Sequence, residues 1–109
     1  MFSLCRLDPG APLPSSFFSV VKTAEELSAV CLAGEEPKGA RTDAGWRAFR
    51  VAGTLDFTLT GVLAALATPL AEAGISIFAV STFDTDYVLV KDLAAARVAL
   101  ESAGHTFLT

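Results

Sequence analysis

The sequence predicts an α+β fold in which two helices are separated by short β-strands. Runs of β-branched and aromatic residues recur along the chain, for example at Ile75–Ser81. Two longer segments, Gly61–Ala73 and Asp92–Ala103, instead repeat apolar residues at the three- and four-residue spacing of a helix. Glycine, proline and acidic residues fall between these segments, as turns require.

The chain has 109 residues, which suit one ordinary domain or two small lobes. It is 52% hydrophobic with a mean hydropathy of +0.53. Such a chain can build its own core, and the surplus of apolar residues suggests a subunit interface, most simply that of a homodimer.

The net charge of −4 argues against two classes of partner. No basic cluster is longer than a dipeptide, whereas nucleic acids and anionic membranes are bound by concentrated positive charge. The first residues lack the pattern of a signal peptide, and the longest uncharged stretch, Phe57–Ala71, is too short and too interrupted to span a bilayer. We therefore expect a cytoplasmic protein that binds neither nucleic acid nor membrane.

The N-terminal part reads as a β-rich lobe. Phe2–Leu7 and Phe17–Lys22 are predicted strands, and Ser28–Leu32 is a predicted return strand. Between the last two, Thr23–Leu27 fits a hairpin connection, although Thr23 and Glu26 also have the spacing of a capping box that would start a helical turn. We favour the hairpin.

The polar, glycine-rich segment Ala33–Gly45 separates this lobe, residues 1–45, from a second domain, residues 46–109. The second domain opens with a predicted strand, Trp46–Ala52. The helix Gly61–Ala73 follows, with Val62, Leu63, Leu66 and Leu70 on its apolar side. Pro69 should kink or divide this helix because proline lacks a backbone donor, and Gly74 stands where a C-cap is expected.

A hairpin and a second helix complete the second domain. The hairpin strands are Ile75–Ser81 and Asp86–Lys91, and Asp92 is the expected N-cap of the helix, whose buried side carries Leu93, Ala96, Leu100 and Ala103. His105–Leu108 is a predicted terminal strand. The resulting βαββαβ order is that of a ferredoxin-like fold, an antiparallel sheet with two helices on one face.

The hairpin has two unusual features. Tyr87–Val90 is apolar at every position, so we expect both faces of the sheet to be covered. The connection Thr82–Asp86 is instead polar, with two carboxylates and two threonine hydroxyls. If the chain has a ligand site, this hairpin tip is the expected place.

Two motifs carry a resemblance to the ACT-domain superfamily. They are V-x-G-x-L-D-F, at 51–57, and G-I-S-I-F-x-x-S-T-F-D-T-D-Y-x-L-V, at 74–90. More narrowly, the sequence resembles small bacterial ACT-like proteins related to the animal arginine sensor CASTOR, whose first lobe is similar to Phe17–Cys31. The first lobe is abbreviated here, so a two-unit site would need a second chain.

The resemblance implies a regulatory or sensing module that binds a small molecule, commonly an amino acid, between ACT units. The positions that it implies lie in the loop before the first helix and at the hairpin tip: Asp56, Phe57, Thr58, Thr60, Gly61, Ser81, Thr82, Phe83 and Asp86. Of these, Thr82, Phe83 and Asp86 match the residues that the arginine sensor places on its ligand.

Each of these residues also has a purely structural explanation. Asp86 could pair with a cationic ligand group, or Asp84 and Asp86 could bond local backbone donors of the turn. Thr60 could cap the helix, or backbone donors there could hold a carboxylate. Thr82 could simply close the hairpin, and Phe83 could anchor a core or an interface.

The sequence offers little for catalysis or metal binding. His105 has no evident nucleophile as partner, and an acid–base pair of Asp84 and Asp86 lacks a base partner or a pocket. Cys5 and Cys31 are expected to be buried thiols rather than a disulfide, and a single histidine leaves zinc without adequate ligands. We therefore expect a protein without cofactor, metal or catalytic activity. The alternative to a ligand-binding module is a structural or protein-interaction module with the same fold.

Overall fold

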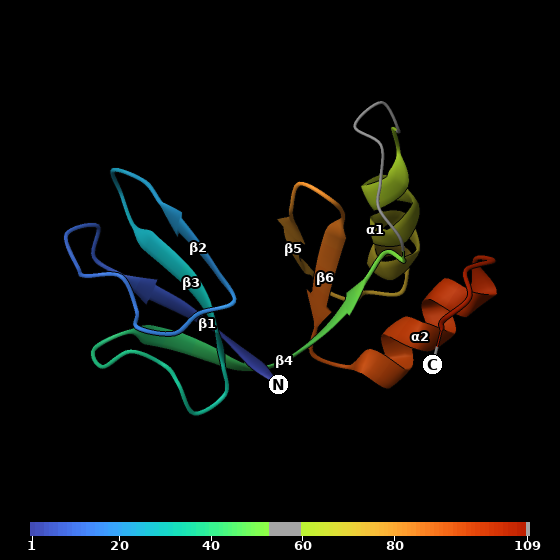
Figure 1. The fold of residues 1–109 in the computed structure, drawn as a ribbon. Coiled ribbons are helices and arrows are strands. Elements are labelled where there is room, and N and C mark those ends of the chain that lie inside the picture. The colour runs from blue at the N-terminus through green and yellow to red at the C-terminus, as the bar shows by residue number, and fades with distance from the viewer. Residues whose placement is uncertain (53–59, 109) are drawn as a thin grey trace. The chain divides into compact units, whose positions relative to one another are not determined.

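The computed structural model describes residues 1–52 and 60–108 (Figure 1). It shows an α+β protein of antiparallel strands and two helices. The chain forms two compact units, Met1–Trp46 and Arg47–Thr109, which are described one at a time. Strand β4, Arg41–Arg50, contributes its first residues to one unit and its last residues to the other.

The first unit is an antiparallel sheet. Its strands are β1 (Phe2–Leu7), β2 (Ser19–Lys22), β3 (Leu27–Leu32) and the start of β4, in the order β2-β3-β1-β4. The β2–β3 connection is a hairpin, as favoured above. The N–H of Thr23 donates to the Glu26 carbonyl at 2.9 Å, and the Thr23 hydroxyl accepts from the N–H groups of Glu25 and Glu26.

The strand predicted at Trp46–Ala52 begins earlier than expected, inside the polar segment Ala33–Gly45. Strand β4 begins at Arg41, where backbone pairing with β1 places Thr42 opposite Cys5. Residues 41–44 are exposed, so the pairing depends on backbone hydrogen bonds and needs no apolar side chains. The polar composition of residues 41–44 therefore did not predict that a strand begins there.

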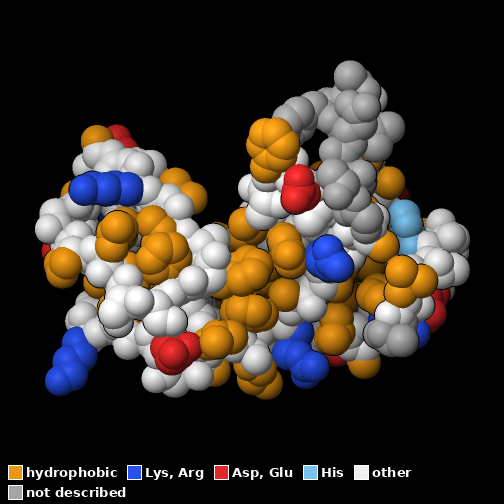
Figure 2. Space-filling model, viewed as in Figure 1, with side chains coloured by type: hydrophobic (Ala, Val, Ile, Leu, Met, Phe, Trp, Pro, Cys, Tyr) orange, Lys and Arg blue, Asp and Glu red, His pale blue; other side chains and the backbone are white. Residues whose placement is uncertain are grey.

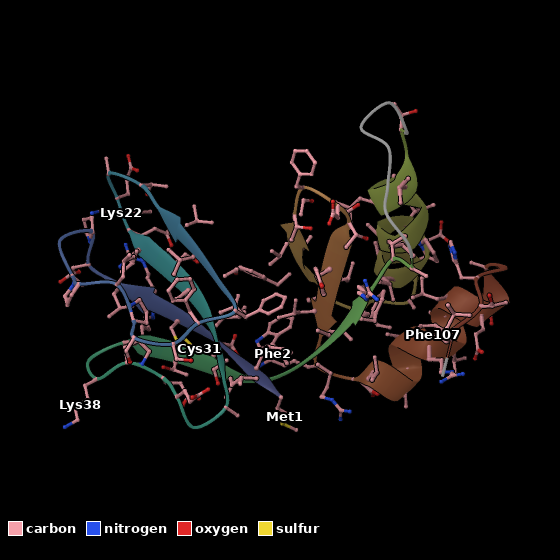
Figure 3. All side chains as sticks on the ribbon, in the orientation of Figure 1. Met1, Phe2, Lys22, Cys31, Lys38 and Phe107 are labelled. Carbon is pink, nitrogen blue, oxygen red and sulfur yellow. The ribbon has the colours of Figure 1, made fainter. Side chains whose placement is uncertain are left out.

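Both cysteines are free, buried thiols of the first unit, as expected. Cys5 and Cys31 pack in one cluster with Ala29, which is the register partner of Cys5 (Figure 3 labels Cys31). Burial, together with the neighbouring Cys5, raises the pKa of the Cys31 thiol to about 11. Because the thiolate is the reactive form, Cys31 is an unreactive thiol at neutral pH.

The second unit packs two helices on one face of a short sheet. The sheet contains the end of β4 with β6 (Asp86–Val90) and β5 (Phe78–Ser81), in the order β4-β6-β5. One core cluster joins residues of α1 (Val62–Glu72), α2 (Leu93–Ser102) and β6: Leu66, Leu70, Ala96, Leu100, Val88 and Val90. Val88 and Val90 alternate on β6, so both helices cover the same face.

Side chains on the opposite face of this sheet are also removed from solvent. Leu89 of β6 is 0% exposed, and its register partners are Ala48 and Phe78. Phe78, Val80 and Tyr87 on this face are half-buried, and Figure 2 shows hydrophobic side chains on the surface over β5 and β6. The apolar run in β6 thus has the burial on both faces that its sequence predicts.

Pro69 lies inside α1 without dividing it. Because proline has no N–H, the carbonyl of Ala65 lacks its usual helical donor. The His105 Nε2 atom lies 2.9 Å from that carbonyl oxygen and takes the place of the missing donor. The helix ends as predicted at Gly74, whose φ of 74° allows the N–H of Ile75 to reach the Leu70 carbonyl.

Helix α2 begins as predicted, because the Asp92 carboxylate accepts from the N–H of Ala95 at 3.0 Å. The prediction of a terminal strand at His105–Leu108 is wrong, since these residues belong to no strand. After Gly104, the N–H of His105 bonds back to the Leu100 carbonyl at 3.0 Å, and the Phe107 ring contacts Phe49 and Arg97. These contacts tie the segment to the helix end instead of to a neighbouring strand.

Candidate functional site

The hairpin tip between β5 and β6 is closed by its two threonines. The N–H of Thr82 donates to the Thr85 carbonyl at 2.8 Å. The Thr82 hydroxyl donates to the same carbonyl at 3.1 Å and accepts from the N–H of Thr85 at 3.2 Å. Thr82 therefore has the hairpin-closing role that was considered as its structural explanation.

Thr85 fixes the tip to the end of the neighbouring strand segment. Its side chain is only 5% exposed and donates to the Val51 carbonyl at 2.9 Å. The N–H of Val51 in turn donates to the Asp86 carbonyl at 3.1 Å. The two bonds hold Val51, the residue that follows β4, directly against the tip.

Asp86 lies at the start of β6 and pairs in register with Ser81 at the end of β5. The Ser81 hydroxyl donates to the Asp86 carboxylate at 2.6 Å. The carboxylate is thus oriented by a side chain rather than by the backbone donors of a turn. Its second oxygen accepts no hydrogen bond from a described residue and remains able to accept one from a ligand.

Phe83 and Asp84, at the outermost point of the tip, are exposed. The Phe83 side chain is 78% exposed, so a role in the core of this chain is excluded and a role at an interface or a ligand stays a prediction. Among the described residues, no hydrogen bond holds the Asp84 carboxylate in the way expected of a turn residue.

The start of α1 is the second part of the predicted site. Gly61 is the N-cap, with φ 76°, and no side chain caps the helix, so the suggestion that Thr60 is the cap is wrong. The first turn contains no acidic residue. Its N–H groups can therefore donate hydrogen bonds to an anionic group such as a carboxylate. Asp56, Phe57 and Thr58 lie outside the described residues.

Figure 1 shows the β5–β6 connection and the start of α1 at the same end of the second unit. The Asp86 carboxylate suits an ammonium or guanidinium group, and the helix start suits a carboxylate. Together they are the complementary groups that an amino acid requires.

A pocket lies in another part of the second unit. We call it the edge pocket; it has a volume of about 430 Å³. It is lined by Ala48–Arg50 of β4 with the following Val51 and Ala52, by Leu66 of α1 and Leu100 of α2, and by the segment His105–Leu108. None of its lining residues is among the predicted site residues, although Val51 bonds to the hairpin tip. The sequence analysis did not identify it, because it depends on the terminal segment being outside the sheet.

Sequence reasoning also missed Thr85, the most buried polar side chain of the tip. The sequence analysis counted it only as one of the two threonine hydroxyls of the connection. The burial results from the return of Val51, which is distant in sequence. Only the pairing of β4 with β6 could have suggested that Val51 lies beside the tip.

One of the comparisons with known proteins shows the family of this chain. A family model described as the ACT domain matches residues 41–101, and a model described as an N-terminal domain matches residues 1–38. A search of curated protein sequences gave no match. None of the helices within residues 1–52 and 60–108 is long and apolar enough to cross a membrane.

Solved structures that are similar to this chain include those of two bacterial proteins. A protein of Agrobacterium tumefaciens, solved by X-ray crystallography, has 38% sequence identity and a TM-score of 0.89, with 98% of this chain and 85% of that chain covered. A Vibrio cholerae protein of unknown function, described as a possible transport protein, has 24% identity and a TM-score of 0.71, with 94% and 80% covered. The second likeness concerns the fold alone.

Proposed function

Because this chain belongs to the ACT domain family, we propose that it is a non-catalytic regulatory module that binds an amino acid. The ligand would lie between the start of α1 and the tip Ser81–Asp86. The observation that carries the proposal is the Asp86 carboxylate, which Ser81 orients at 2.6 Å while one of its oxygens is available to a ligand.

The chemistry of the two parts gives each end of the ligand a partner. The ammonium or a cationic side chain would bind Asp86 through a charge-assisted hydrogen bond. The carboxylate would bind the N–H groups that follow Gly61. Asp56, Phe57 and Thr58, which lie outside the described residues, stay part of the proposed site.

The remaining parts of the proposal are a homodimer, a ferredoxin-like arrangement of the ACT domain built from β4, α1, β5, β6 and α2, a cytoplasmic location and the narrower likeness to the arginine sensor. A second chain is part of the proposal because ACT ligands lie between units and the first lobe is abbreviated. The high apolar content, 52%, supports burial between subunits.

A thermal-shift screen against the twenty amino acids tests the proposal. A ligand at 100 times its dissociation constant adds roughly 2.7 kcal/mol to the free energy of unfolding, which raises the melting temperature clearly. If no amino acid raises it, the amino-acid ligand is refuted.

Matched variants then locate the site. Asp86→Asn preserves an acceptor for Ser81 but removes the charge, so it should abolish the shift. Asp84→Asn, an exposed neighbour two residues away, should retain the shift. If both variants bind as the original protein does, the ligand lies elsewhere.

The second candidate function is a protein-interaction module without a small ligand. The 78% exposure of the Phe83 side chain favours it, because large exposed aromatic residues are common anchors of interfaces. A negative amino-acid screen together with dimer formation that depends on Phe83 would support this alternative.

A further inference from the structure

We propose that the edge pocket binds an extended peptide segment that adds to the free edge of β4 as a further strand. The segment would carry an acidic residue beside Arg50, with an apolar residue on each side of it. This site is distinct from the proposed amino-acid site and does not depend on it.

The strand register shows which backbone groups of β4 are available. Phe49 pairs with Val88 and Arg47 with Val90, and the N–H of Val51 donates to Asp86. In an antiparallel pair every second residue bonds to the neighbouring strand, so these odd-numbered residues bond to β6. The N–H and C=O groups of Ala48 and Arg50 therefore point to the other edge.

That edge has no neighbouring strand in the part of the chain that the structure describes. The pairing of β4 with β1 ends at Trp46. The segment His105–Leu108 lines the pocket across from the edge but belongs to no strand. An edge with unpaired backbone groups is a template for a further strand.

The pocket beside this edge has the size and lining of a binding site. Its volume of about 430 Å³ lies within the range of ligand pockets. Phe49 and Phe107 meet there with ring centroids 5.7 Å apart, and Leu66 and Leu100 add apolar surface (Figure 3 labels Phe107 beside α2). Apolar side chains of an added strand would be buried against these residues.

Arg50 indicates the charge of the segment. Its side chain is exposed and lies on the face of β4 opposite to Phe49. An acidic residue across from it would form a favourable cross-strand pair. The unpaired part of β4 in a second copy would not supply one, because Arg47–Arg50 contains no acidic residue and Asp43 already pairs with Leu4 of β1.

Alternation then defines the sequence pattern of the segment. In the added segment, the side chain opposite Arg50 lies on the same face of the sheet as Arg50. The side chains before and after it in the segment lie on the other face, toward Phe49 and the helices. The probe is therefore the pentapeptide acetyl-Ser-Val-Glu-Val-Ser-amide, and its control has lysine in place of glutamate.

The experiment is an NMR titration of the ¹⁵N-labelled full chain with each peptide at millimolar concentration. Binding of the glutamate peptide should shift the amide signals of Ala48 and Arg50 and slow their hydrogen exchange. The amide of Phe49, which already bonds to β6, should keep its exchange rate. The lysine peptide should bind up to about fivefold more weakly.

Two variants test the role of the charge. Arg50→Leu should remove the preference for glutamate over lysine. Arg47→Leu, whose side chain lies on the other face of β4, should preserve it.

Three results would overturn the proposal. The first is slow exchange of the Ala48 and Arg50 amides in the free protein, which would mean that the edge is already paired. The second is the absence of shifts at these amides with the glutamate peptide. The third is a preference for glutamate that survives Arg50→Leu.

Discussion

Thr85 determines the geometry of the hairpin tip through one hydroxyl group. The donor is almost fully buried and its acceptor, the Val51 carbonyl, belongs to a residue far away in sequence. A buried acceptor that loses its donor costs about 1–3 kcal/mol, whereas an exposed one is satisfied by water. The tip therefore depends on Thr85 more than on the exposed residues around it.

We predict that Thr85→Val lowers the free energy of unfolding by about 1–3 kcal/mol, since valine preserves the shape but leaves the Val51 carbonyl without a partner. Denaturant unfolding measures this loss. Thr68→Val, on the exposed side of α1, is the matched control and should change stability by less than about 0.5 kcal/mol. Equal effects of the two substitutions would contradict the role of Thr85.

Glu36 gives the first unit a dependence on pH. The buried hydroxyl of Ser3 donates to its carboxylate at 2.6 Å, and the N–H of Gly34 donates at 2.9 Å. The Ser3 hydrogen bond is the main cause that lowers the pKa of Glu36 below its usual 4.5. A carboxylate whose pKa is lowered on folding stabilises the protein above its unfolded pKa.

We therefore predict that this stabilisation is complete above pH 4.5 and is lost as the pH falls through the lower, folded pKa of Glu36. Urea midpoints measured between neutral and acidic pH should decline less steeply for Glu36→Gln than for the original protein. Glu35→Gln, at the exposed neighbouring position, should leave the slope as it is. An unchanged slope for Glu36→Gln would refute the prediction.

At the scale of the elements, Pro69 and His105 form a compensating pair. The proline removes a donor from α1, and the histidine ring supplies one to the same carbonyl from beyond α2. The two residues should therefore be coupled energetically although they do not bond to each other.

A double-mutant cycle measures this coupling. In the original protein, His105→Ala should cost about 0.5–1 kcal/mol because the Ala65 carbonyl loses its donor. In a Pro69→Ala background the helical N–H returns, so the same change should cost clearly less. Identical costs in both backgrounds would show that the carbonyl does not link the two positions.

The elements that the sequence predicted correctly are those with strong local signals. The caps at Asp92, Gly74 and Gly104 depend on side-chain oxygens and on positive φ, which are properties of single residues. Strand β1 has the predicted bounds because its apolar residues are continuous. The start of β4 at Arg41 and the absence of a strand at His105–Leu108 result from backbone pairing and tertiary contacts, which local composition does not contain.

The candidate site was predictable to a similar extent. The position of the hairpin tip followed from two β-rich runs around a polar connection, and the pairing of Ser81 with Asp86 follows from that hairpin. The bond from Thr85 to Val51 and the edge pocket could not be predicted, because each joins segments that only the folded chain brings together.

At the scale of the whole molecule, the proposed homodimer makes a direct prediction. Light scattering at micromolar concentration should give twice the chain mass of 11.4 kDa. If the tip lies at the interface, Phe83→Ser should shift the protein toward the monomer, whereas Val98→Ser, at another exposed apolar position, should not. A monomer at this concentration would refute the homodimer.

Strand β4 makes the boundary between the two units ambiguous. Residues 41–46 match the sequence model of the ACT domain, yet they belong to the compact unit Met1–Trp46 and pair with β1. An expression fragment that starts at residue 41 keeps the whole of β4 but lacks β1, with which the start of β4 pairs. A fragment that starts at residue 47 cuts β4 in two. A substitution such as Thr42→Pro would be recorded as a defect of the ACT domain, although its structural damage would arise beside Cys5 in the other unit.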